Sequence, residues 1–271
     1  MLRSKVRELE VIPGEWLDSL IAKLGEYDRS LRRAEGFALA FRALTRAHPL
    51  PDFFDKTVRA ALGLSSTTSS APLSDVVRIQ GMHIVTSLMQ DASEARRALV
   101  WVSHATRVAT DAFLSPDWKV RNAALSLFAS LVRRSVSTQA HDEDAPSAAA
   151  AAAVRTDEGT SPTTTSLAFA ATIGASIPTR TFETSHPGLL AHLNTVLADR
   201  WREDRAAASS LVGGNSAAAV QPILVMLSSL RRSGTGEDGR PDPADVFMPT
   251  LVELVRGHAQ WMVRTAAARA L

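Results

Sequence analysis

A short arginine-centred pattern recurs along this chain, and it constrains the fold more than any other feature. The pattern is a valine or arginine, then an arginine, two further residues and a small residue. The four copies are Arg32–Gly36, Val77–Gly81, Val120–Ala124 and Val263–Ala267. The last two copies also share a tryptophan two residues before the valine. A pattern that recurs in this way predicts similar supersecondary units stacked on one another.

The spacing of the copies indicates the kind of unit. The arginines of successive copies are 45, 43 and 143 residues apart. The last interval is about three periods of the roughly 40–47 residues typical of HEAT and armadillo repeats. We therefore predict an all-α fold, a HEAT/armadillo-like α-solenoid with a disordered insertion. The small residue would let two helices approach closely, and the arginine would reach across to the neighbouring repeat.

Composition supports a helical fold and excludes thiol chemistry. Hydrophobic residues make up 45% of the chain but aromatic residues only 6%, a balance that favours helices over β-branched and aromatic strands. The chain has no cysteine, which excludes disulfides, thiol catalysis and thiolate metal sites. Five of the first ten residues are charged and no apolar signal-peptide core follows the start, and no stretch approaches the roughly 20 apolar residues of a membrane helix. We therefore expect a soluble, cytoplasmic protein.

The net charge of +2 is weak support for nucleic-acid binding, so the local placement of arginines matters more. Three adjacent pairs occur at positions expected to be helical: Arg96 with Arg97, Arg133 with Arg134, and Arg231 with Arg232. Two interpretations stay open for each pair. The cations either lie at solvated helix ends, where they favour the carbonyl terminus of the helix dipole, or contact phosphates.

Changes in composition divide the chain into three segments. Residues 1–134 and 179–271 have helical periodicity, whereas residues 135–178 form a low-complexity insertion with six consecutive alanines and many Ser and Thr residues. The last segment stops in mid-helix without a polar capping repeat, so we expect it to be truncated. Apart from two helices in 16–44 with a break near 25–28, the expected helices cover 76–90, 93–113, 118–134, 186–197, 222–230 and a final pair in 246–271.

No pattern in the sequence indicates an active site or a metal site. The seven histidines are scattered, and none pairs with a carboxylate at a ligand spacing on one helical face. Phosphate-loop, nucleophile-elbow and His-Glu-x-x-His motifs are absent from the sequence. The sequence therefore predicts no catalytic residues and no bound metal. We expect Trp118 and Trp261 to be buried at equivalent helix starts.

The segment Phe113–Arg134 resembles a hallmark of the thyroid-adenoma-associated protein family. The matching residues are Trp118, Val120, Arg121, Asn122, Leu127, Phe128, Leu131 and Arg134. Nearer the N-terminus, Arg32, Arg33 and Gly36 are similar to the family's Arg-Arg-Ser-Ala-Gly-Leu-Pro motif, and the other positions of that motif differ. The similar segments occur in the same order as in the family. Segments 180–182, 186–187, 222–230 and 263–271 continue the resemblance.

This resemblance implies a function, because fungal members of the family are the non-catalytic subunit of a tRNA ribose 2′-O-methyltransferase. It implies a scaffold that supports methylation of the first anticodon-loop nucleotide of tRNA by a partner methyltransferase. S-adenosylmethionine would be bound by the partner, and this chain would need no cofactor, metal or membrane. Arg32, Arg33 and Gly36 would contact tRNA or the partner.

The remaining motif residues are expected to be structural: Arg78, Trp118, Val120, Arg121, Asn122, Trp261, Val263 and Arg264. A rival hypothesis is a HEAT-type adaptor that binds only proteins and no RNA. Convergence of the arginine pairs on one positive face would favour the tRNA scaffold, and dispersal would favour the adaptor.

Overall fold

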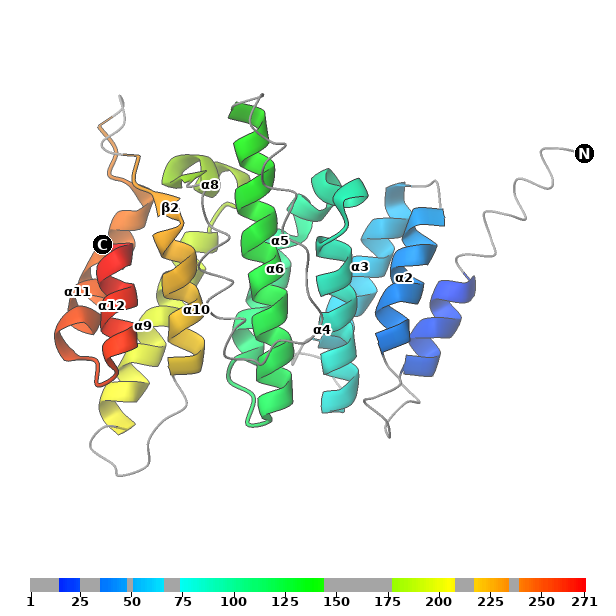
Figure 1. The fold of residues 1–271 in the computed structure, drawn as a ribbon, viewed down its shortest axis with the longest axis horizontal. Coiled ribbons are helices and arrows are strands. Elements are labelled where there is room, and N and C mark those ends of the chain that lie inside the picture. The colour runs from blue at the N-terminus through cyan, green and yellow to red at the C-terminus, as the bar shows by residue number, and fades with distance from the viewer. Residues whose placement is uncertain are drawn as a thin grey trace, which may run out of the picture. The chain divides into compact units, whose positions relative to one another are not determined.

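A computed structural model of the chain describes residues 15–24, 35–47, 51–65, 74–143, 177–207, 217–233 and 239–271. These residues are mostly helical, which confirms the all-α prediction (Figure 1). The chain divides into two compact units, Met1–Leu131 and Val132–Leu271. None of the helices in the described segments combines the length and apolar character needed to cross a bilayer.

The first unit is built from helices that contact their second neighbours along the chain. It contains a helix over residues 15–24, then α2 (Glu35–Ala47), α3 (Pro51–Ser65), α4 (Asp75–Met89), the 3-10 turn η2 (Ala92–Glu94), α5 (Ala95–Ala112) and the start of α6 (Trp118–Glu143). Helix α4 packs against both α2 and α3, and α3 packs against α5. This adjacency is the one expected for stacked helical hairpins.

A small residue is required where α4 crosses α3. A Cβ atom added to Gly81 would lie 2.6 Å from the Ala61 carbonyl oxygen and would collide with Ser65 Oγ. The equivalent small residues of the later copies, Ala124 and Ala267, are fully buried. The expected role of the small residue, close approach of two helices, is therefore confirmed at Gly81.

The second unit repeats the same adjacency. It contains the end of α6 and then β1 (Ile177–Pro178), α8 (Thr179–Ser185), α9 (Leu189–Ala207), α10 (Ala217–Ser228), β2 (Leu230–Arg231), η4 (Pro243–Phe247), α11 (Met248–Gly257) and α12 (Trp261–Ala270). Helix α12 packs against α10 and α11, and α9 packs against α10 and α11. Strands β1 and β2 form a short parallel pair, with Ile177 opposite Leu230.

Both ends of the predicted low-complexity insertion, 135–178, contain residues with regular structure. Helix α6 continues through Glu143, and Ser135 within it is fully buried, donating its hydroxyl to the Val132 carbonyl at 3.0 Å. At the other end Ile177 is buried and its N–H donates to the Ser229 carbonyl at 3.3 Å. These contacts assign both ends to the folded structure. Residues 144–176 lie outside the described part of the chain, so their predicted disorder stays a prediction.

Candidate functional site

Three of the four motif copies occupy the same register on a helix. The arginine is the fourth residue of α4, α6 and α12, and the preceding valine is buried in each. The first copy differs, because Gly36 is the second residue of α2 and is exposed, with open space around its Cα. Arg32 and Arg33 lie outside the described residues, so their proposed contact role stays a prediction.

The arginines of the last two copies hold the turn that precedes their own helix. Arg121 donates from Nη1 to the carbonyls of Ser115 and Pro116, at 2.7 and 2.8 Å. Arg264 donates from Nη1 to the carbonyls six and five residues before it, at 2.6 and 3.1 Å. The expectation that these arginines reach across to the neighbouring repeat is therefore wrong for Arg121 and Arg264. Their guanidinium groups instead bind nearby backbone carbonyls of the turn that would otherwise need another hydrogen-bond donor. Arg78 instead pairs with Asp75 at 3.0 Å.

The two motif tryptophans are exposed, which contradicts the prediction that they are buried. The exposed fraction is 62% for Trp118 and 67% for Trp261. Each begins its helix, and the valine two residues later is the one that enters the core, with an exposed fraction of 0–1%. Asn122 is also exposed. The repeat alignment holds in register, but the indoles are surface groups.

The turns before α6 and α12 share one further contact. Ser115 Oγ accepts a hydrogen bond from the Asp117 N–H at 3.3 Å. At the equivalent place, His258 Nδ1 accepts one from the Gln260 N–H at 3.1 Å. Both acceptor residues are buried. A serine and a histidine therefore perform the same local task in the two turns.

A buried carboxylate links α2 to the turn after α4. Arg46 binds Asp91 through two hydrogen bonds, of 2.6 and 2.9 Å, across 45 residues of sequence. Asp91 is also the N-cap residue of η2, and its side chain accepts hydrogen bonds from the N–H and the hydroxyl of Ser93. The hydrogen bond from Arg46 lowers the pKa of Asp91 to about 2, with help from Ser93 and against the opposing effect of burial. The sequence analysis missed this link, although its span equals one repeat period.

Each unit also contains an indole that donates to a carboxylate on another helix. Trp101 on α5 donates to Asp55 on α3 at 2.6 Å, and Arg59 lies 5.7 Å from the centre of the indole. In the second unit Trp201 on α9 donates to Glu253 on α11 at 2.6 Å, with Arg205 5.8 Å from the ring. These contacts join helices that are second neighbours along the chain.

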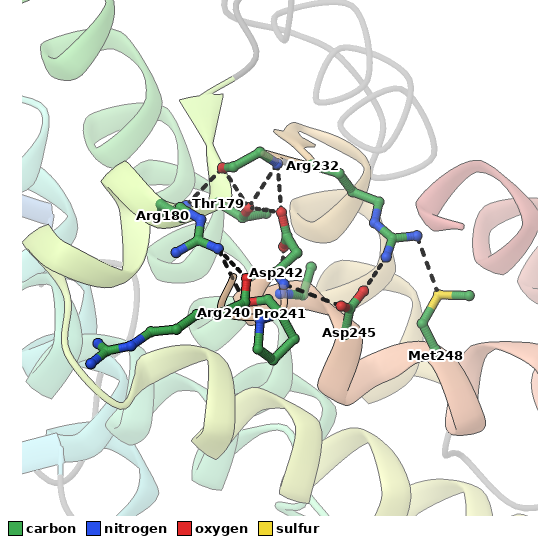
Figure 2. A network of polar contacts seen from close by, with 10 residues as sticks. Thr179, Arg180, Arg232, Arg240, Pro241, Asp242, Asp245 and Met248 are labelled. Atoms are coloured by element: carbon green, nitrogen blue, oxygen red, sulfur yellow. Dashed lines mark hydrogen bonds and ion pairs between the residues drawn. The ribbon is translucent and has the colours of Figure 1, made fainter. Parts of the chain in front are cut away.

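Figure 2 shows a polar junction in the second unit between the start of α8, the segment that follows β2, and the start of η4. Asp242 accepts hydrogen bonds from Thr179 Oγ1 and from the backbone N–H groups of Ser233 and Ala244, at 2.8, 2.5 and 2.8 Å. Burial alone would raise the pKa of Asp242, but these hydrogen bonds and the charge of Arg232 outweigh burial and lower it. The junction therefore binds an ionised carboxylate as a structural anchor.

The arginine pairs provide no test of a common positive face. Arg96 and Arg133 are exposed and lie in different units. Arg97 is engaged with Glu94 at 3.0 Å, and Arg232 pairs with Asp245. Phosphate contact by the arginine pairs therefore stays a prediction.

The described residues bring together no metal cluster, and one groove among them is lined mainly by apolar side chains. No group of three or more His, Cys, Asp or Glu residues within the described ranges could hold a metal ion. A groove with a volume of about 470 Å³ lies between the helix over 15–24 and α2, and Trp16, Leu20 and Leu44 contribute to its walls. This groove contains only one ionisable side chain, Lys23, so it offers a surface for apolar contact rather than acid–base chemistry.

Comparison with known proteins identifies relatives of the first unit. Residues 1–119 match the family described as THADA/TRM732, DUF2428. Proteins named tRNA (32-2'-O)-methyltransferase regulator THADA, from Mus musculus and Homo sapiens, are each 26% identical in an alignment of 134 residues that covers 46% of this chain. The matched part is only 7% of the length of those relatives. No solved structure matches the chain significantly.

Proposed function

Because this chain carries a THADA/TRM732 region in residues 1–119, we propose that it is a non-catalytic scaffold that supports tRNA methylation. The reaction is 2′-O-ribose methylation of the first anticodon-loop nucleotide by a partner methyltransferase. The observation that carries the proposal is the match to relatives named as regulators of a tRNA 2′-O-methyltransferase. The partner binds S-adenosylmethionine, and the complex acts in the cytoplasm.

The physical contribution of such a scaffold is positioning. Methyl transfer to a ribose hydroxyl requires the reacting oxygen and the methyl donor to meet in one geometry. Holding two reactants in that geometry supplies a large part of a barrier without a catalytic side chain in the scaffold. A HEAT/armadillo-like solenoid suits this task, because it offers an extended surface for the shape and phosphates of a folded RNA.

The structure contributes the rigidity that this role requires. The arginines in the turns before α6 and α12 hold the start of each helix to its own turn, and the Arg46–Asp91 link joins α2 to the turn after α4. Positioning to within a fraction of an ångström depends on such supporting contacts.

The proposal is tested by removing the chain from its own cells and measuring ribose methylation at the first anticodon-loop nucleotide by mass spectrometry of tRNA fragments. Methylation should be lost, and re-expression of the full chain should restore it. Unchanged methylation would overturn the proposal. The alternative, a HEAT-type adaptor without RNA binding, predicts unchanged methylation and no tRNA in complexes purified with the chain.

A double substitution, Arg32→Ala with Arg33→Ala, tests the contact residues of the proposal. Methylation should be abolished while helical content and melting stay nearly intact. Loss of one or two phosphate contacts should also reduce the salt dependence of tRNA binding by roughly one unit of slope per contact. The matched control is Arg107→Ala with Lys119→Ala, which removes the same charge from two exposed positions of the same unit. Full activity of the Arg32 and Arg33 variant would exclude these residues from the contact.

A further inference from the structure

The turns before α6 and α12 have the same architecture but different chemistry. In both turns a buried side chain accepts a hydrogen bond from the N–H of the residue two positions later in the chain. The backbone carbonyl of that same buried residue accepts a hydrogen bond from an arginine six positions later. The acceptor is Ser115 in the first turn and His258 in the second. A hydroxyl oxygen accepts at any pH near neutrality, whereas an imidazole nitrogen accepts only while it is unprotonated.

The hydrogen bond at Nδ1 fixes the form of the His258 ring. Because Nδ1 accepts from Gln260, the single hydrogen of the neutral ring lies on Nε2. Nε2 lies 3.4 Å from Asp204 Oδ2 on α9. The second proton of an imidazolium must therefore go to Nδ1, where it would face the N–H of Gln260.

Charged groups around the ring come from three helices. From α9, Asp204 faces Nε2, and Arg205 lies beyond Trp201, which stacks on the imidazole with ring centres 5.8 Å apart. From α11, Glu253 accepts from Trp201 and Arg205. From α12, Arg264 binds the His258 carbonyl at 2.6 Å. The carboxylate of Asp204 is therefore the charged group placed to stabilise an imidazolium, and it does so from the side away from the turn.

We propose that the turn between α11 and α12 is a protonation-dependent device. While His258 is neutral, its Nδ1 accepts a hydrogen bond from the Gln260 N–H, and this bond keeps the turn before α12 closed. Protonation keeps the ring beside Asp204 but breaks the bond to Gln260, because two N–H groups then face each other. The turn opens, and the contacts that Arg264 makes with it loosen.

The device controls the direction in which α12 begins. Gln260 is the N-cap residue of α12, and the next two residues, Trp261 and Met262, are 67% and 49% exposed. An open turn changes how this exposed apolar pair is presented. The acceptor in the turn before α6 is Ser115, which does not titrate near neutral pH. Of the two arginine-held turns, only the one before α12 can therefore respond to protonation in this way. This inference does not depend on the proposed function.

Amide hydrogen exchange of the full chain, followed by NMR between pH 7.5 and 5.0, tests the proposal. After correction for the intrinsic pH dependence of exchange, protection of the Gln260 amide should be about tenfold lower at pH 5.0 than at pH 7.5, the equivalent of one hydrogen bond. Protection of the Asp117 amide in the serine turn should not change. Equal protection of Gln260 at both pH values would overturn the proposal.

Two variants separate local opening from general loosening. His258→Ser installs the acceptor of the equivalent turn, and Gln260 should then stay protected at pH 5.0. If that variant fails to fold, His258→Asn serves instead, because its amide oxygen also accepts a hydrogen bond at any pH in this range. The amides of Ile223 and Leu224 in the core of α10 report on the whole unit. A parallel loss of protection there, or a persistent response in His258→Ser, would refute a local device.

Discussion

At the residue scale, the motif places its valine in the core and its tryptophan on the surface. Val120 and Val263 lie in the core, whereas the tryptophans two residues earlier are more than 60% exposed. Hydrophobicity alone would have assigned the larger side chain to the core, and that assignment is wrong. The first residue of a helix points back over the preceding turn, and here no neighbour covers that direction among the described residues.

The first prediction compares these two positions. Val120→Ala should lower the free energy of unfolding by about 2 kcal/mol, from the loss of buried methyl groups and the cavity that remains. Trp118→Ala should cost less than about 1 kcal/mol, because most of the indole stays in water in the folded state. Urea unfolding of the two variants measures both values. A larger cost for Trp118→Ala would show that the indole is covered in solution.

A buried histidine in the second unit predicts a pH dependence of stability. His186 is 2% exposed, its Nε2 has no hydrogen-bond partner among the described residues, and burial lowers its pKa to about 4. The unfolded chain binds a proton near the ordinary value of about 6.5, so stability is complete above that pH and falls as pH decreases to about 4. The full loss should be about 3 kcal/mol.

Urea unfolding at pH values from 7.5 to 4.0 checks this expectation. The variant His186→Gln should lose the slope in this range. Asp91 provides an internal contrast, because its pKa of about 2 places its own loss of stability below pH 4. A slope that survives in His186→Gln would assign the effect to another group.

At the scale of elements, the starts of α6 and α12 are stabilised by one side chain each. Arg121→Met keeps much of the apolar stem but removes both hydrogen bonds to the turn. We expect a loss of about 1–3 kcal/mol in the free energy of unfolding, because hydrogen bonds from a charged donor are the stronger kind. Arg264→Met should behave alike. Lys119→Met, an exposed neighbour on α6, is the control and should stay within about 0.5 kcal/mol of the parent.

The sequence predicted these elements better than it predicted their contacts. Apolar periodicity and capping residues placed α4, α5, α6 and α12, each of which starts within about two residues of its expected position. It did not predict α3, α8 or the two-residue strands, since a strand of two residues has no periodicity to detect. The Arg46–Asp91 and Trp101–Asp55 links were also missed, because pairing across about 45 residues depends on how the helices stack.

The candidate contact residues show the same limit. The motif predicted that Arg121 and Arg264 matter, but a spacing pattern does not reveal whether a long side chain reaches the next repeat or its own turn. The structure assigns both arginines to their own turns. Gly36 is exposed, which agrees with a contact role but does not test it.

At the scale of the whole molecule, stability is distributed over neighbouring helices. The polar links span 45, 46 and 52 residues and join helices within one unit. In such an arrangement each helix depends on the helices packed against it, and a segment that makes no contacts with them can be replaced without affecting them. The effect of replacing the insertion on stability therefore depends on whether the replaced segment includes residues that contact these helices.

Replacing residues 144–176 with a Gly/Ser sequence of equal length should leave the melting temperature nearly unchanged, as expected for a low-complexity segment without an apolar periodic face. Replacing residues 135–178 instead should destabilise the second unit. That wider change removes the buried Ser135 and also Ile177, whose exposed fraction is 3% and which pairs with β2. Calorimetry of both variants against the parent separates the two boundaries. A comparable loss in the narrower variant would show that residues 144–176 contribute to the core.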